Sequence, residues 1–132
     1  MLLIAAILLS GPILSPGLCQ YDYTIVVEHL PDVPVPSAFV NLSTQDLADY
    51  PLIRRVLTAF GNTSSYAPAF MRDGVLHYPT PTRDDPVVTA TNSYLVQRWG
   101  AGVYPLTLTT GDGEFYTWGL SVSDPGNFAP CP

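Results

Sequence analysis

The sequence predicts an α+β domain: a small antiparallel sheet built from hairpins, with two short helices packed mainly on one face. Three observations support this fold class. Residues 103–122 alternate apolar and polar side chains around a Gly-Asp-Gly turn, residues 66–78 contain an Asp-Gly turn, and two segments with helical spacing separate the strand-like stretches. The order strand, helix, hairpin, helix, hairpin is typical of α+β proteins with an antiparallel sheet.

The hairpin expected over residues 103–122 has the clearest pattern. A three-residue loop, Gly111-Asp112-Gly113, would place six apolar residues on one face, as the pairs Leu108 with Tyr116, Leu106 with Trp118 and Tyr104 with Leu120. The other face would pair Thr107 with Thr117 and Thr109 with Phe115. A two-residue loop mixes apolar and polar residues on both faces. Since a one-residue slip exchanges the faces, burial of one face selects the longer loop.

The first strand is expected at residues 23–30, where both sides are partly apolar, as in a strand covered on both faces. Three prolines within residues 31–36 exclude a helix and favour an extended connector. A short edge strand is expected at residues 37–42.

A helical region is expected to begin at Ser43 or Thr44, and the motif Asp49-Tyr50-Pro51 indicates a second start, because proline is tolerated near the beginning of a helix. The main helix is predicted over residues 50–60, ended by Gly61. Its apolar face is expected to pack on the sheet, and a helix that binds a partner is the alternative. That face contains Leu52, Ile53, Val56, Leu57 and Phe60.

The motif Asp73-Gly74 predicts a second hairpin, with a two-residue turn that pairs Arg72 with Val75, Met71 with Leu76 and Phe70 with His77. Asp85-Pro86 is typical of a helix start, and Gly100 would end that helix. The helix is predicted up to Trp99, most clearly over residues 91–99, and the β-branched residues Val87, Val88, Thr89 and Thr91 argue for a strand as the alternative over its first turns. Residues from about 123 to 132 form a tail rich in proline and glycine that either drapes over the core or stays mobile.

Residues 1–19 resemble a secretory signal peptide or an N-terminal anchor, followed by a single domain at 20–132. Residues 2–18 carry no charge, although the usual basic residues are missing. Cleavage after Cys19 would leave Cys131 alone in the tail. A lipid-modified Cys19 is disfavoured by Leu18. A bond between Cys19 and Cys131 needs the leader retained, and is not expected.

Charge excludes some partners. The net charge is −6 and the chain has no lysine, so neither nucleic acid nor anionic lipid is an expected partner. Membrane contact is expected only through residues 1–19, if they are retained. Asn41 and Asn62 begin Asn-x-Ser/Thr triplets, which would be glycosylation acceptors in a secreted protein of suitable origin.

Catalytic signatures are weak. His29 and His77 are the only histidines, and no spacing typical of a zinc site, cofactor loop or nucleophile motif is present, so no metal or cofactor is expected. The loop at Asp112 is too short to supply the oxygens that calcium needs. The aromatic residues Tyr104, Tyr116 and Trp118 are expected in the core; if the helices leave them bare, they would form a ligand or partner surface.

The leading hypothesis is a small secreted or surface-tethered module that binds or assembles, with an unknown extracellular protein or glycan as its partner. The first alternative is a small extracellular hydrolase that uses His29 or His77 with a carboxylate. The second alternative is a fibre or surface-layer subunit, for which exposed strand edges would be the marker.

Overall fold

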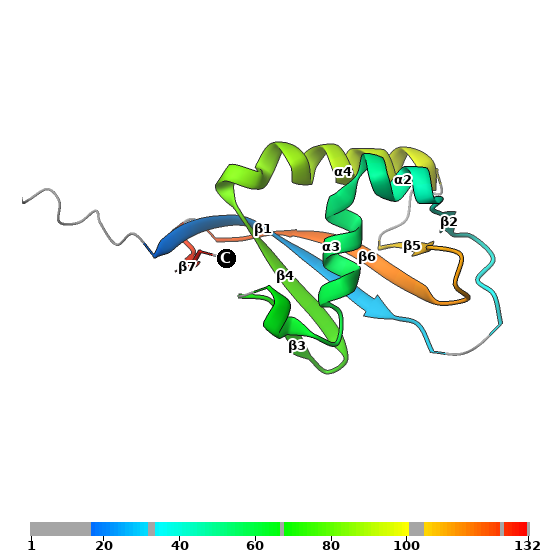
Figure 1. Cartoon of the computed structure of the whole chain (residues 1–132), viewed down its shortest axis with the longest axis horizontal. Coiled ribbons are helices and arrows are strands. Elements are labelled where there is room, and N and C mark those ends of the chain that lie inside the picture. The colour runs from blue at the N-terminus through cyan, green and yellow to red at the C-terminus, as the bar shows by residue number, and fades with distance from the viewer. Residues whose placement is uncertain (1–16, 32–33, 67, 101–104, 125, 132) are drawn as a thin grey trace, which may run out of the picture.

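The computed structural model describes residues 17–31, 34–66, 68–100, 105–124 and 126–131. These residues form an α+β domain in which a mixed sheet carries helices on one face (Figure 1). The predicted fold class is confirmed at this level. The prediction of a purely antiparallel sheet with two helices is wrong in detail, as the strands and helices below show.

The sheet contains seven strands. They are β1 Leu18–His29, β2 Val40–Asn41, β3 Phe70–Arg72, β4 Val75–Pro81, β5 Leu106–Thr109, β6 Phe115–Val122 and β7 Phe128–Pro130. The order is β2-β5-β6-β1-β4-β3, and β7 pairs with the first part of β1. All pairs are antiparallel except β2 with β5. Helices and a hairpin separate β2 from β5 along the chain, and a connection of that length allows parallel pairing.

Both hairpins have the predicted registers. Leu106 pairs with Trp118 and Leu108 with Tyr116, while Phe70 pairs with His77. Asp73 and Gly74 have φ values of 53° and 79°, which are the left-handed conformations that a two-residue hairpin turn requires. The proposed partner of Leu120, Tyr104, lies outside the described residues.

The described residues form three α-helices instead of two: α2 Thr44–Asp49, α3 Pro51–Ala59 and α4 Asp85–Trp99. Short 3-10 turns, η1 Thr63–Ser65 and η2 Thr82–Asp84, lie before β3 and α4. Ser43 and Asp46 cap α2 reciprocally. The helix α4 begins at Asp85, so the predicted helix start is confirmed and the alternative of a strand over the first turns is wrong. Burial of Val88 and Thr91 outweighs their weak helix propensity.

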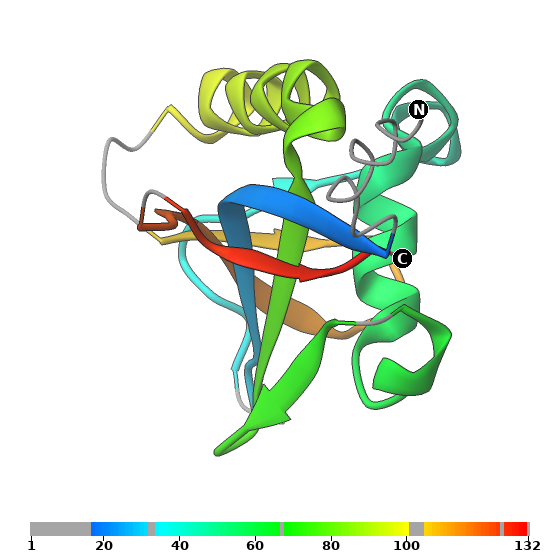
Figure 2. The ribbon, with the colours of Figure 1, turned by 90° about the vertical axis from the view of Figure 1, so that its left-hand side faces the viewer.

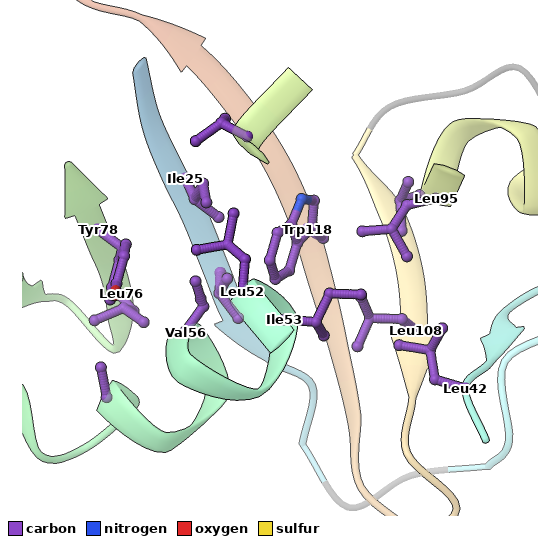
Figure 3. Close-up of a cluster of buried hydrophobic side chains, with 14 of the residues drawn as sticks. Ile25, Leu42, Leu52, Ile53, Val56, Leu76, Tyr78, Leu95, Leu108 and Trp118 are labelled. Atoms are coloured by element: carbon purple, nitrogen blue, oxygen red, sulfur yellow. The ribbon is translucent and has the colours of Figure 1, made fainter. Parts of the chain in front are cut away.

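The core lies between the sheet and the helices. Figure 3 shows Leu52, Ile53 and Val56 of α3 and Leu95 of α4 pointing toward the side chains of one sheet face. That face contains Ile25, Val27, Leu76, Tyr78, Leu106, Leu108 and Trp118, all buried. The alternation along each strand therefore separates a face that the described helices cover from a helix-free face, which none of them covers.

A disulfide joins Cys19 to Cys131, with Cα atoms 5.1 Å apart. The expectation that these cysteines would not pair is wrong. The tail turns back as β7 beside the start of β1, which brings Cys131 to Cys19 (Figure 2). The Tyr21 hydroxyl donates a hydrogen bond of 2.6 Å to the Pro130 carbonyl, which holds the same strand. Cleavage after Cys19 would remove Leu18 and Cys19 from the start of β1, and the disulfide could then not form.

Among the described residues, no helix has the length and apolar content needed to cross a membrane.

Candidate functional site

The two histidines lie on opposite faces of the sheet. His77 pairs with Val26 on the helix-free face, whereas His29 follows Ile25 and Val27 on the covered face. Successive side chains on a strand alternate between faces, and three positions separate Val26 from His29. The two imidazoles therefore do not share one site.

His29 contacts a carboxylate and two aromatic rings. Its Nε2 forms a hydrogen-bonded ion pair with Glu114 of the β5–β6 turn. The ring centroids of Tyr116 and Phe60 lie 5.1 and 6.3 Å from the imidazole. The pair follows from the β1–β6 register, which places His29 opposite Tyr116, and Tyr116 follows Glu114 by two residues. No local signal in the sequence indicates this pairing, because the two strands are far apart in the chain.

His77 faces the side of the sheet without helices. Its ring stacks on Phe70, with centroids 4.7 Å apart, and the Arg72 guanidinium lies 5.4 Å from the Phe70 centroid. A hollow of about 400 Å³ lies beside this stack, between β4 and the tail strand β7. Both polar and apolar residues line this hollow. Among the described lining residues, the ionisable groups are the His77 imidazole and the Tyr21 phenol.

The aromatic set predicted from sequence is divided by the structure. Trp118 is 1% exposed, so its ring belongs to the core and is excluded from a ligand surface. Its indole Nε1 is buried without a hydrogen-bond partner. Tyr116 is partly buried and lines a hollow beside α3. Tyr104 lies outside the described residues.

The outer side of α3 brings polar and aromatic groups together. Arg54, Arg55 and Thr58 are exposed there, opposite the face that packs in the core. One hollow of about 230 Å³ separates this side from the β5–β6 turn and includes Asp112 and Tyr116. A second hollow, of about 250 Å³, is lined by Arg54, Arg55, Thr58, Tyr66 and Tyr78. We call the three α3 residues and these two hollows the α3 surface.

Neither Arg54 nor Arg55 forms an ion pair with a carboxylate of the described residues. Within the described part of the chain, the ion pairs are His29 with Glu114 and Arg98 with Asp46. The chain has 11 acidic and only 5 basic residues, yet two of the five are adjacent and unpaired here. The α3 surface therefore presents two adjacent cations on an acidic protein, with the Asp112 carboxylate across the first hollow from Arg54.

Two stacked tyrosines form one wall of the second hollow. The rings of Tyr66 and Tyr78 are 4.1 Å apart and inclined by 11°. Burial raises the pKa of Tyr78 to about 12, against the opposing charge of Arg55. Burial also raises the pKa of Tyr66, and its hydroxyl is buried without a partner. Both phenols consequently remain neutral at physiological pH. Sequence reasoning missed these residues, because only the fold places them beside α3.

Asp46, Tyr94 and Arg98 form a further polar cluster with a structural role. Arg98 donates to an Asp46 oxygen at 3.2 Å and to the Tyr94 hydroxyl at 2.6 Å. The Tyr94 hydroxyl also donates to Asp46, so the cluster fastens α2 to α4. The Tyr94 ring stacks on Tyr50 at 4.1 Å. Since these groups satisfy one another, the cluster offers little to a ligand.

In the residues that the structure describes, no group of three or more His, Cys, Asp or Glu side chains could hold a metal ion. Asn41 and Asn62 both have exposed side chains, as a glycan acceptor requires.

Comparisons of the chain with protein-family models, with curated proteins and with solved structures found no match.

Proposed function

We propose that this chain is a secreted binding module that acts through the α3 surface on an extracellular protein or glycan carrying acidic groups. The observation that supports the proposal is the Arg54–Arg55 pair, which forms no ion pair with a described carboxylate. Both arginines border one hollow, and Arg54 also borders the other. Arginine forms paired hydrogen bonds to carboxylate and related anions more readily than lysine does. An acidic chain that keeps this pair unneutralised is suited to an acidic partner.

The disulfide supports secretion. Bonds of this kind persist in oxidising compartments and are rare in the cytosol. The apolar run near the start of the sequence resembles an export signal. We expect processing to leave Cys19 in the mature chain, and the small residues Ser15 and Gly17 suit a cut before Leu18. The exposed side chains of Asn41 and Asn62 are compatible with a glycoprotein.

The test compares two charge reversals. The double variant Arg54→Glu, Arg55→Glu alters the α3 surface, and the control Arg72→Glu, Arg83→Glu changes the net charge equally at other sites. Each purified chain is measured against immobilised extracellular polysaccharides and surface proteins by biolayer interferometry. Wild type and control should bind the same acidic partners, and the α3 variant should lose them. Equal binding by both double variants would refute the proposal.

A small extracellular hydrolase remains the second candidate, because His29 and Glu114 form a histidine–carboxylate pair. A panel of chromogenic esters and glycosides would test it. If the protein is such an enzyme, His29→Ala and Glu114→Gln should both abolish turnover, whereas His77→Ala should not. Absence of turnover by the wild type on every substrate in the panel would count against this candidate.

A fibre or surface-layer subunit has less support. The outer strands of the main sheet are short, with two residues in β2 and three in β3. Short edges are one way in which proteins limit edge-to-edge assembly. Light scattering over a concentration series should therefore give a constant monomer mass, and a rising mass would favour the fibre hypothesis.

A further inference from the structure

We propose that the hollow bordered by Arg54, Arg55, Tyr66 and Tyr78 binds a single carboxylate-bearing sugar ring, a hexuronic acid unit of an extracellular glycan. This inference rests on the proposed function and specifies its partner. It joins three features of one site: cations at the rim, an aromatic wall and a small volume.

The rim supplies the anion contact. Arg54 and Arg55 are consecutive and exposed, and both side chains line the hollow. The charge of Arg55 acts on both phenols of the wall. A guanidinium binds a carboxylate through two parallel hydrogen bonds, which fixes the orientation of the sugar as well as its charge. Neither side chain would have to leave an existing ion pair with a described carboxylate, so binding carries no cost of that kind.

The wall supplies a flat apolar surface. Tyr78 is 1% exposed and supports the partly exposed ring of Tyr66 from behind. A rigid aromatic face of this kind is suited to the C–H face of a pyranose. The side chain of an aspartate or glutamate offers the carboxylate without such a face, which favours a sugar over an acidic peptide. Because both phenols stay protonated, the wall does not repel the anion.

The size and the surrounding charge limit the ligand further. A hollow of about 250 Å³ is smaller than the pockets of roughly 300–1,000 Å³ that hold drug-sized ligands, so it suits one ring. The net charge of −6 disfavours densely charged polymers such as nucleic acids or polysulfated chains. A glycan with one carboxylate for each bound ring avoids most of that repulsion.

The experiment titrates the full mature chain, with its disulfide intact, with galacturonic and glucuronic acid trisaccharides and with their neutral counterparts. Binding is followed by isothermal titration calorimetry and by tyrosine fluorescence. We expect the acidic forms to bind at least about tenfold more tightly than the neutral ones, a difference of ~1.4 kcal/mol. Arg55→Gln should weaken the acidic sugar by at least about tenfold, whereas the matched variant Arg72→Gln should leave it unchanged.

Two tyrosine variants test the wall. Tyr66→Phe keeps the ring and removes the unpaired hydroxyl, so it should bind like the wild type. Tyr66→Ala should lose binding, provided that circular dichroism shows it folded. If Tyr66→Ala fails to fold, Arg54→Gln provides the second test, with the same expected loss as Arg55→Gln.

Three results with the sugars would overturn the inference: equal binding of neutral and acidic sugars, equal weakening by Arg55→Gln and Arg72→Gln, or no measurable binding of any uronide. A short Asp-containing peptide that binds this hollow in place of the sugars would also overturn it. That last result would assign the site to a protein partner and leave the binding function intact. Failure of the proposed function would be recognised separately, because the two charge-reversed double variants would then capture partners equally.

Discussion

Removal of the disulfide is the perturbation whose magnitude follows most directly from the structure. Cys19 and Cys131 are 112 residues apart, so their bond closes almost the whole described chain into one loop. The loop-entropy relation assigns about 4.7 kcal/mol to a loop of roughly 100 residues, so the double variant Cys19→Ser, Cys131→Ser should be less stable by ~4–5 kcal/mol. With an unfolding entropy of ~2 cal/mol/K for each residue, this corresponds to a melting temperature about 20 °C lower.

The assay is urea unfolding followed by circular dichroism, on the oxidised wild type, the reduced wild type and the double variant. The reduced wild type and the double variant should agree, because both restore the freedom of the unfolded chain. The folded spectra should remain similar, since the core between sheet and helices does not contain the bond. A difference in stability below ~1 kcal/mol would refute the reasoning, since it would mean that the bond is absent or that the unfolded chain stays compact without it.

Three further predictions concern the core, one turn and acid stability. Trp118→Ala should lower the free energy of unfolding by ~3–5 kcal/mol, because the ring is 1% exposed, and an unchanged melting temperature would contradict its place in the core. Gly74→Ala should cost about 1 kcal/mol by chemical denaturation, because φ is 79° there, whereas a stabilised variant would exclude the left-handed turn. Hydrogen bonds, first from Tyr94, hold the pKa of Asp46 well below its ordinary value of 3.8, so this carboxylate stabilises the fold above about pH 4 and loses that effect as the pH falls. Unfolding measured from pH 7 to pH 2 should therefore show a smaller acid-induced loss for Asp46→Asn than for the wild type, and parallel curves would contradict this role.

The site could be predicted from the sequence only in part. Helical spacing places Arg54, Arg55 and Thr58 on the side of α3 opposite its apolar face, so their exposure follows from the sequence. The tyrosines that complete the hollow come from after η1 and from β4, and nothing local indicates that they lie beside α3. The pairing of His29 with Glu114 likewise depends on two strands that are far apart in the chain.

What the sequence determined by itself is local. The alternation around Gly111-Asp112-Gly113 specified the register of one hairpin, because a slip of one residue would bury polar side chains. The two-residue turn at Asp73-Gly74 specified the register of the other. Capping residues and proline positions likewise specified where α2 and α3 begin. What the tertiary structure alone decided is every contact that closes a long loop: the parallel pairing of β2 with β5, the return of β7 to β1 and the disulfide that follows from it. Such contacts depend on packing summed over the whole core, and no short stretch of sequence carries that information.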